Sequence, residues 1–124
     1  MNKTVLVLED ERALSVAIKT SLIKSGFLVL LSNNVDDAIK LLEESPQIDA
    51  VWLDHYLLGS KNGIDFMYNL KSNEKWHNIP VFVVTNSVSD EKISTYEILG
   101  IKNYFVKSSS SLSEIISTIK KSTK

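Results

Sequence analysis

The sequence predicts an α/β fold in which a parallel β-sheet is covered by helices on both faces. Short apolar runs alternate along the chain with segments of helical hydrophobic period, and such alternation is typical of parallel sheets. The runs are apolar throughout, so both faces of each strand are expected to be buried. Strands are expected at Val5–Leu8, Phe27–Leu31, Ala50–Leu53, Val81–Val84 and, from a weaker run, Tyr104–Val106.

Helices are expected in the intervals that follow these runs. Three intervals carry apolar residues spaced by three or four positions, which is the period of a helix with one buried face. The stripes are Leu14, Ala17, Ile18 and Leu22; Val35, Ala38, Ile39 and Leu42; and Leu112, Ile115, Ile116 and Ile119. Segments 64–70 and 93–99 are less regular but compatible with helices.

The expected helix ends carry suitable residues. Gly26 and Gly100 follow the first and fourth helices, as C-terminal glycines do. Ser111 and Glu114 form the pattern of a capping box at the start of the last helix, and Asn34 begins the second helix in a similar way. These signals support five strands alternating with five helices.

Composition excludes several classes of protein. The 124 residues suit a single domain over residues 1–124, and 44% hydrophobic with 23% charged residues is ordinary for a globular chain. A net charge of −1 provides no general basic field for nucleic acid. There is no cysteine, so disulfides, cysteine zinc sites and thiol nucleophiles are excluded. The longest apolar run is far too short to span a membrane, and a cytoplasmic location is expected.

Polar residues stand where the expected strands end. Glu9 and Asp10 follow the first strand, Asp54 the third, Thr85 the fourth and Lys107 the fifth. Each has an ordinary structural explanation when taken alone, such as a helix-dipole contact, a turn or a solvated surface. Ligands of open α/β sheets bind at the carboxyl ends of the strands, so together these residues indicate a site.

The charges of that site predict a metal ion. If the first and third strands are neighbours, the carboxylates of Glu9, Asp10 and Asp54 crowd together. Two charges ~5 Å apart repel by about 3 kcal/mol at an effective dielectric constant of 20, and three pairs by on the order of 10 kcal/mol. Mg²⁺ is the natural hard cation to offset this repulsion. With Lys107 and Thr85 added, the set describes a phosphoryl-transfer site in which an aspartate is the nucleophile.

The motifs at the strand ends resemble those of the response-regulator receiver family of bacterial two-component systems. They are Val5–Glu11, Trp52–Asp54, Val83–Thr85 and Tyr104–Lys107, and the resemblance covers essentially the whole chain. It implies a flavodoxin-like, doubly wound parallel sheet of five strands in the order 2-1-3-4-5 with five helices. The strand order comes from the family and does not follow from the pattern.

The resemblance also implies roles for individual residues. Asp54 matches the phosphoacceptor, Lys107 the lysine that contacts the phosphoryl group, and Thr85 the switch hydroxyl that moves toward it. Tyr104 matches the aromatic switch residue that turns inward on activation.

A second group of positions matches the family's metal site. The implied ligands for Mg²⁺ (or Mn²⁺) are Asp10, Asp54, the backbone carbonyl of Tyr56 and, through water, Glu9.

Several positions depart from the family pattern. Ser108 follows Lys107 where a proline is usual, so the loop takes a trans path or a strained cis bond. Asn86 stands where a small residue is usual and is expected to narrow access to Asp54. Tyr56 stands where the family tunes the lifetime of the phosphoryl group, and its ring predicts slow self-dephosphorylation. The loop after Asp54 is one residue longer than usual.

The function expected from these residues is a phosphoacceptor signalling switch. Its partners would be a histidine kinase or a histidine phosphotransfer protein and an unknown downstream protein, without direct binding to nucleic acid or membrane. A phosphorylation-linked dimer stays open. The protein would catalyse only its own phosphorylation and dephosphorylation, and so is not expected to be an enzyme.

Other readings remain or are rejected. The remaining alternative is an interaction module with the receiver fold that works without phosphorylation, favoured by Ser108 and Asn86. An aspartate-nucleophile phosphatase is rejected because Tyr56 occupies the position of its second aspartate. No glycine-rich nucleotide-binding motif follows a strand. His55 is expected to be a loop residue that points away from the metal.

Overall fold

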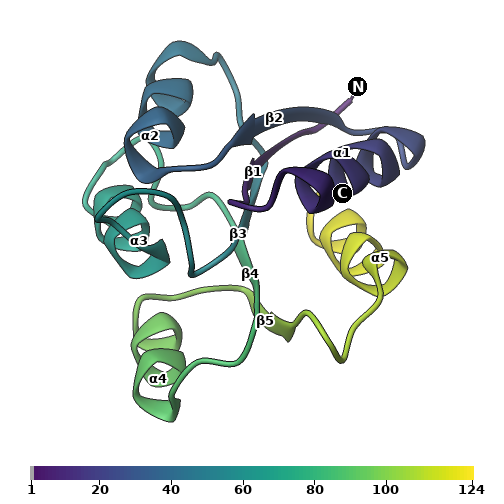
Figure 1. Cartoon of the computed structure of the whole chain (residues 1–124). Coiled ribbons are helices and arrows are strands. Elements are labelled where there is room, and N and C mark those ends of the chain that lie inside the picture. The colour runs from purple at the N-terminus through teal and green to yellow at the C-terminus, as the bar shows by residue number, and fades with distance from the viewer. Residues whose placement is uncertain (1) are drawn as a thin grey trace.

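Residues 2–124 are described by the structure, a computed structural model (Figure 1). The strands are β1 Thr4–Leu8, β2 Leu28–Ser32, β3 Ala50–Leu53, β4 Val81–Thr85 and β5 Asn103–Val106. The helices are α1 Arg12–Lys24, α2 Val35–Glu44, α3 Gly63–Lys71, α4 Asp90–Ile98 and α5 Leu112–Ser122. All strand pairs are parallel and the sheet order is β2-β1-β3-β4-β5, so the predicted fold is confirmed.

The helices form a layer on each face of the sheet. In Figure 1, α1 and α5 lie on one side of the strands, and α2, α3 and α4 lie on the other. Each layer has its own core, because alternate residues of a strand point to opposite faces. On β3, for example, Trp52 packs with Ile18 and Ile119 on the α1–α5 side, whereas Leu53 packs with Phe66 on the other. Within residues 2–124, no helix is long and apolar enough to cross a membrane.

Burial follows the predicted pattern except in the edge strands, among them β2, whose Leu28 is 53% exposed, and at one residue of α1. β3 and β4 are buried along their whole length, as expected for central strands, while the edge strand β5 is only half-buried. In α1, Ala17 is exposed, and the buried residues are Ser15, Ile18 and Leu22. The prediction that Ala17 faces the core is therefore wrong. Ser15 lies on the buried face of the helix instead, where its hydroxyl donates a hydrogen bond to the carbonyl of Arg12.

The expected helix ends are present. Gly26 and Gly100 adopt positive φ angles of 97° and 86°, which side chains rarely tolerate. Ser111 and Glu114 form the predicted capping box. A second capping box, of Asn62 and Asp65, starts α3 and was not predicted. It anchors the end of the loop that follows Asp54.

Candidate functional site

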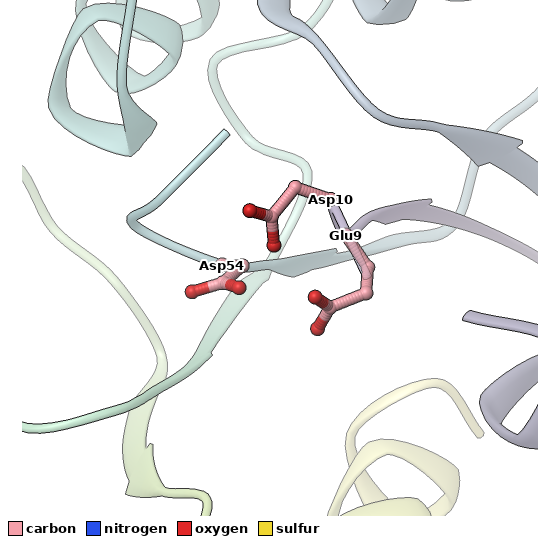
Figure 2. A group of neighbouring side chains, drawn as sticks. All are labelled: Glu9, Asp10 and Asp54. Atoms are coloured by element: carbon pink, nitrogen blue, oxygen red, sulfur yellow. The ribbon is translucent and has the colours of Figure 1, made fainter. Parts of the chain in front are cut away.

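Sheet register brings the three predicted carboxylates together. Leu8 of β1 pairs with Leu53 of β3, so the next residues of both strands reach the same edge of the sheet. The amide of Asp54 donates to the carbonyl of Leu8 at 3.0 Å and extends this pairing by one residue. Glu9, Asp10 and Asp54 each offer an oxygen within 4.8 Å of the others. Figure 2 shows the three side chains gathered at this edge of the sheet.

The Asp54 carboxylate is buried and held from both oxygens. Its side chain accepts a hydrogen bond from Thr85 Oγ1 at 2.5 Å on Oδ1 and from Lys107 Nζ at 2.9 Å on Oδ2. The backbone amide of Tyr56 adds a longer contact of 3.3 Å to Oδ1. Asp54 is 1% exposed, so these donors stand in for water around the charge. Thr85 and Lys107 reach it together because the Lys107 amide donates to the Thr85 carbonyl at the carboxyl end of β4.

Lys107 is shared between two buried carboxylates. Its ammonium lies 2.9 Å from Glu9 Oε1 and 2.9 Å from Asp54 Oδ2. Burial, with a smaller contribution from the nearby charge of Asp54, raises the pKa of Glu9 to about 7 despite its ion pair with Lys107. Burial lowers the pKa of Lys107, but its hydrogen bonds to Asp54 and Glu9 outweigh that effect and raise the pKa overall. The ammonium is therefore a fixed positive charge.

The site carries more negative than positive charge. Glu9, Asp10 and Asp54 contribute three negative charges against one positive charge from Lys107, which leaves two when all are ionised. Asp10 is exposed, so the cluster opens to solvent on that side. Carboxylate oxygens with room for water are the ligands that a hard divalent cation prefers, and the donor set fits such an ion.

Tyr56 and Asn86 border this site. The Tyr56 side chain is 45% exposed, and its hydroxyl donates to the Ser87 carbonyl at 3.4 Å, which links the loop after β3 to the loop after β4. Asn86 is exposed, with no contact to Asp54 among the hydrogen bonds of residues 2–124.

Tyr104 and the Lys107–Ser108 bond complete the predicted set. The Tyr104 residue is half-buried, but its hydroxyl oxygen is fully buried, so the ring points inward. Burial raises its pKa. The Lys107–Ser108 peptide is trans, as are all the peptide bonds of the described residues, so Ser108 takes the trans path that the sequence left open.

His55 and Tyr96 form a contact that the sequence did not predict. His55 follows Asp54 in the loop, as expected, but it is 2% exposed and its Nδ1 shares a 2.6 Å hydrogen bond with the hydroxyl of Tyr96 on α4. Burial lowers the pKa of His55 and raises the pKa of Tyr96, so it favours the uncharged form of each group. Nothing in the sequence spacing linked these residues, which lie 41 positions apart.

The fold and the site together define a doubly wound α/β domain with an acidic cluster at the carboxyl edge of its sheet, where ligands of such sheets bind. The response regulator receiver domain model matches residues 5–120, and the chain belongs to this family. It is accordingly a receiver domain of the two-component response regulators.

Relatives and solved structures agree with this assignment. The transcriptional regulatory protein CpxR of Escherichia coli (strain K12) is 35% identical over 108 residues, which are 86% of this chain and 43% of that protein. The chain thus spans less than half of that relative. A response regulator receiver protein from Pseudomonas putida has a TM-score of 0.90 at 18% identity, covering 98% of both chains. Chemotaxis protein CheY4 of Vibrio cholerae has a TM-score of 0.86 at 16% identity, again covering 98% of both. These two structures bear on the fold alone.

Proposed function

We propose that the protein is a phosphoacceptor switch in which Asp54 takes a phosphoryl group from a phosphohistidine of a histidine kinase or histidine phosphotransfer protein. The observation that carries this proposal is the pair of donors on the buried Asp54 carboxylate, Lys107 on one oxygen and Thr85 on the other. Phosphoryl transfer needs positioning and charge neutralisation above all, and this arrangement supplies both.

The proposed reaction follows from these contacts. A carboxylate oxygen of Asp54 attacks the phosphorus, the phosphorus–nitrogen bond breaks, and the imidazole of the donor leaves with the electron pair and takes up a proton. Before the reaction, the ammonium of Lys107 donates to Asp54 Oδ2 at 2.9 Å. After it, the ammonium would contact the phosphoryl oxygens instead. The Thr85 hydroxyl, which donates to Asp54 Oδ1 in the unphosphorylated protein, would turn to donate to the same group, and its movement with Tyr104 would carry the change toward β5.

The residues that would hold Mg²⁺ or Mn²⁺ are Glu9, Asp10, Asp54 and the backbone carbonyl of Tyr56. The excess of negative charge in the cluster supports this assignment. The ion would supply charge neutralisation for the phosphoryl oxygens. Asp10 is the exposed member of the cluster, so it would mark the side on which the ion and a phosphodonor approach.

Phosphorylation would act by changing the affinity for a downstream protein. Residues 1–124 would work as one receiver unit, alone or within a longer protein. A switch needs a difference in binding free energy between two states, and the Thr85 and Tyr104 side chains are the proposed source of that difference. Dimerisation on phosphorylation is one way in which the change could be read.

A second candidate function is a receiver-fold interaction module that works without phosphate. The observation that favours it is the contact of the Tyr56 hydroxyl with the Ser87 carbonyl, which joins the loop after β3 to the loop that carries Asn86. The intact set of Asp10, Asp54, Thr85 and Lys107 favours the phosphorylated switch.

The test is the intact mass of the protein after incubation with Mg²⁺ and acetyl phosphate. One added phosphoryl group is expected in the wild type and none in Asp54→Ala or after chelation of the metal. If no adduct forms, a phosphorylated histidine protein is supplied as the donor. Failure with both donors would reject the switch and leave the interaction module.

A further inference from the structure

Helix α4 is attached to the domain by a single fully buried side chain. Tyr96 is the one buried residue of α4, whereas the other four helices each bury three or four. Ile93 and Leu99 are only partly buried, and Ile98 is 85% exposed. The position of the helix therefore depends largely on where the Tyr96 ring is held.

The hydroxyl of Tyr96 reaches the segment that carries Asp54. It shares the 2.6 Å hydrogen bond with His55 Nδ1, and the two rings meet edge to face with centroids 5.7 Å apart. The space for this hydroxyl exists because residue 63 is a glycine, since a Cβ there would collide with the Tyr96 oxygen. The amide of Gly63 in turn donates to the His55 carbonyl at 3.0 Å.

We propose that the His55–Tyr96 hydrogen bond is the tether through which α4 and the Asp54 segment sense each other's position. Resting on the proposed function, this makes Tyr96 a positioning residue for the switch. A shift of the loop after Asp54 would move His55, and α4 would follow because the tether is its main buried anchor. The coupling is reciprocal, so a partner that displaces α4 would also act on the loop.

The two residues of a buried hydrogen-bonded pair have non-additive effects on stability when they are replaced, and this makes the tether testable. Removing one partner leaves the other without a hydrogen bond in a site that water does not fill, whereas removing both leaves no unpaired group. The two effects are therefore not additive. Two residues that merely pack nearby would show additive effects.

The experiment is amide hydrogen exchange on the unphosphorylated protein, comparing wild type with Tyr96→Phe. We expect residues 90–98 and 55–62 to exchange about tenfold faster in the variant, which corresponds to about 1.4 kcal/mol for the hydrogen bond, with α1, α2 and α5 within about twofold of wild type. Tyr68→Phe, which alters an exposed ring on α3, is the matched control and is expected to change neither segment.

Two further variants decide whether the bond itself is responsible. The double variant His55→Leu with Tyr96→Phe is expected to exchange no faster than His55→Leu or Tyr96→Phe alone. His55→Gln keeps a polar partner for the Tyr96 hydroxyl, so its residues 90–98 are expected to exchange more slowly than those of His55→Leu. Equal acceleration in all helices, additive effects in the double variant, or no change in residues 90–98 would each overturn the tether.

Phosphorylation then separates this inference from the proposed function. With Mg²⁺ and acetyl phosphate, the exchange of α4 is expected to change in the wild type, and most of that change should be lost in Tyr96→Phe when the two proteins are compared at equal extents of phosphorylation, measured by intact mass. A full response in the variant would overturn the tether. If the wild type takes up no phosphate, the proposed function fails, and the comparison of unphosphorylated proteins still decides the tether.

Discussion

Replacing Gly63 by alanine is expected to destabilise the protein, although the local backbone would suggest the opposite. Gly63 opens α3 without a positive φ angle, and alanine at such a position usually stabilises by about 0.4–1 kcal/mol. Here an added Cβ would collide with the Tyr96 oxygen and lie 2.9 Å from the Asp54 carbonyl oxygen and 3.1 Å from His55 Cα. Two of the three neighbours are backbone atoms, which cannot move aside as a flexible side chain can.

The expected net cost is about 1–2 kcal/mol. Overpacking of a well-filled site costs roughly 1–3 kcal/mol, from which the small conformational gain is subtracted. Urea unfolding followed by tryptophan fluorescence measures this free energy. Tyr96→Phe in the same chain should recover part of the cost, because it removes the nearest of the colliding atoms.

Gly26→Ala serves as the control for that cycle. Gly26 has open space around it but a φ of 97°, so its cost comes from backbone strain and should not depend on residue 96. The reasoning would be refuted if Gly63→Ala proved as stable as the wild type, or if Tyr96→Phe relieved Gly26→Ala equally well.

The other predictions concern the site and one helix cap. Tyr56→Asn should lose its phosphoryl group faster than the wild type, by roughly tenfold for a barrier change of about 1.4 kcal/mol, and equal decay by mass spectrometry would contradict a role of the ring in excluding water. In metal-free buffer, the Glu9 pKa of about 7 lies above its ordinary 4.5, so the folded state binds the extra proton and stability should fall as pH rises between these values. The free energy of unfolding should fall by no more than about 3 kcal/mol over this range, and Glu9→Gln should remove most of that fall. Urea midpoints that depend on pH as strongly in Glu9→Gln as in the wild type would argue against Glu9 as the origin. Ser111→Ala should cost about 1 kcal/mol through loss of the α5 cap, whereas Ser113→Ala, on the exposed face of the first turn, should change the urea midpoint little.

Most of the fold could be predicted because the apolar period carries it. The central strands β3 and β4 are apolar on both faces, and their predicted bounds agree with the structure to within a residue. The edge strand β5 is half-buried, which explains its weaker signal. Ala17 is predicted wrongly because a small residue on either side of a stripe fits the same helical period, and packing decides which of the two is buried.

The carboxylates of the site were predictable for a different reason. Glu9 and Asp54 directly follow β1 and β3, and Asp10 follows Glu9, so a parallel sheet places all three at one edge, where the pairing of β1 with β3 brings them together. The Tyr56 contact with Ser87 and the bond between His55 and Tyr96 depend on side-chain directions in loops and on a distant helix. No periodicity carries that information. The Asn62–Asp65 cap, by contrast, follows a recognisable spacing and could have been read from the sequence.

The strand order has a consequence for how the chain folds during synthesis. β2 and β3 both pair with β1, β4 pairs with β3, and β5 pairs with β4, so each strand after β1 pairs with a strand that was synthesised before it. Lys107 follows the last of these strands. Glu9 and Asp54 are therefore synthesised before Lys107, the cation that they share, and their ion pairs with it can form only after the last strand has been made.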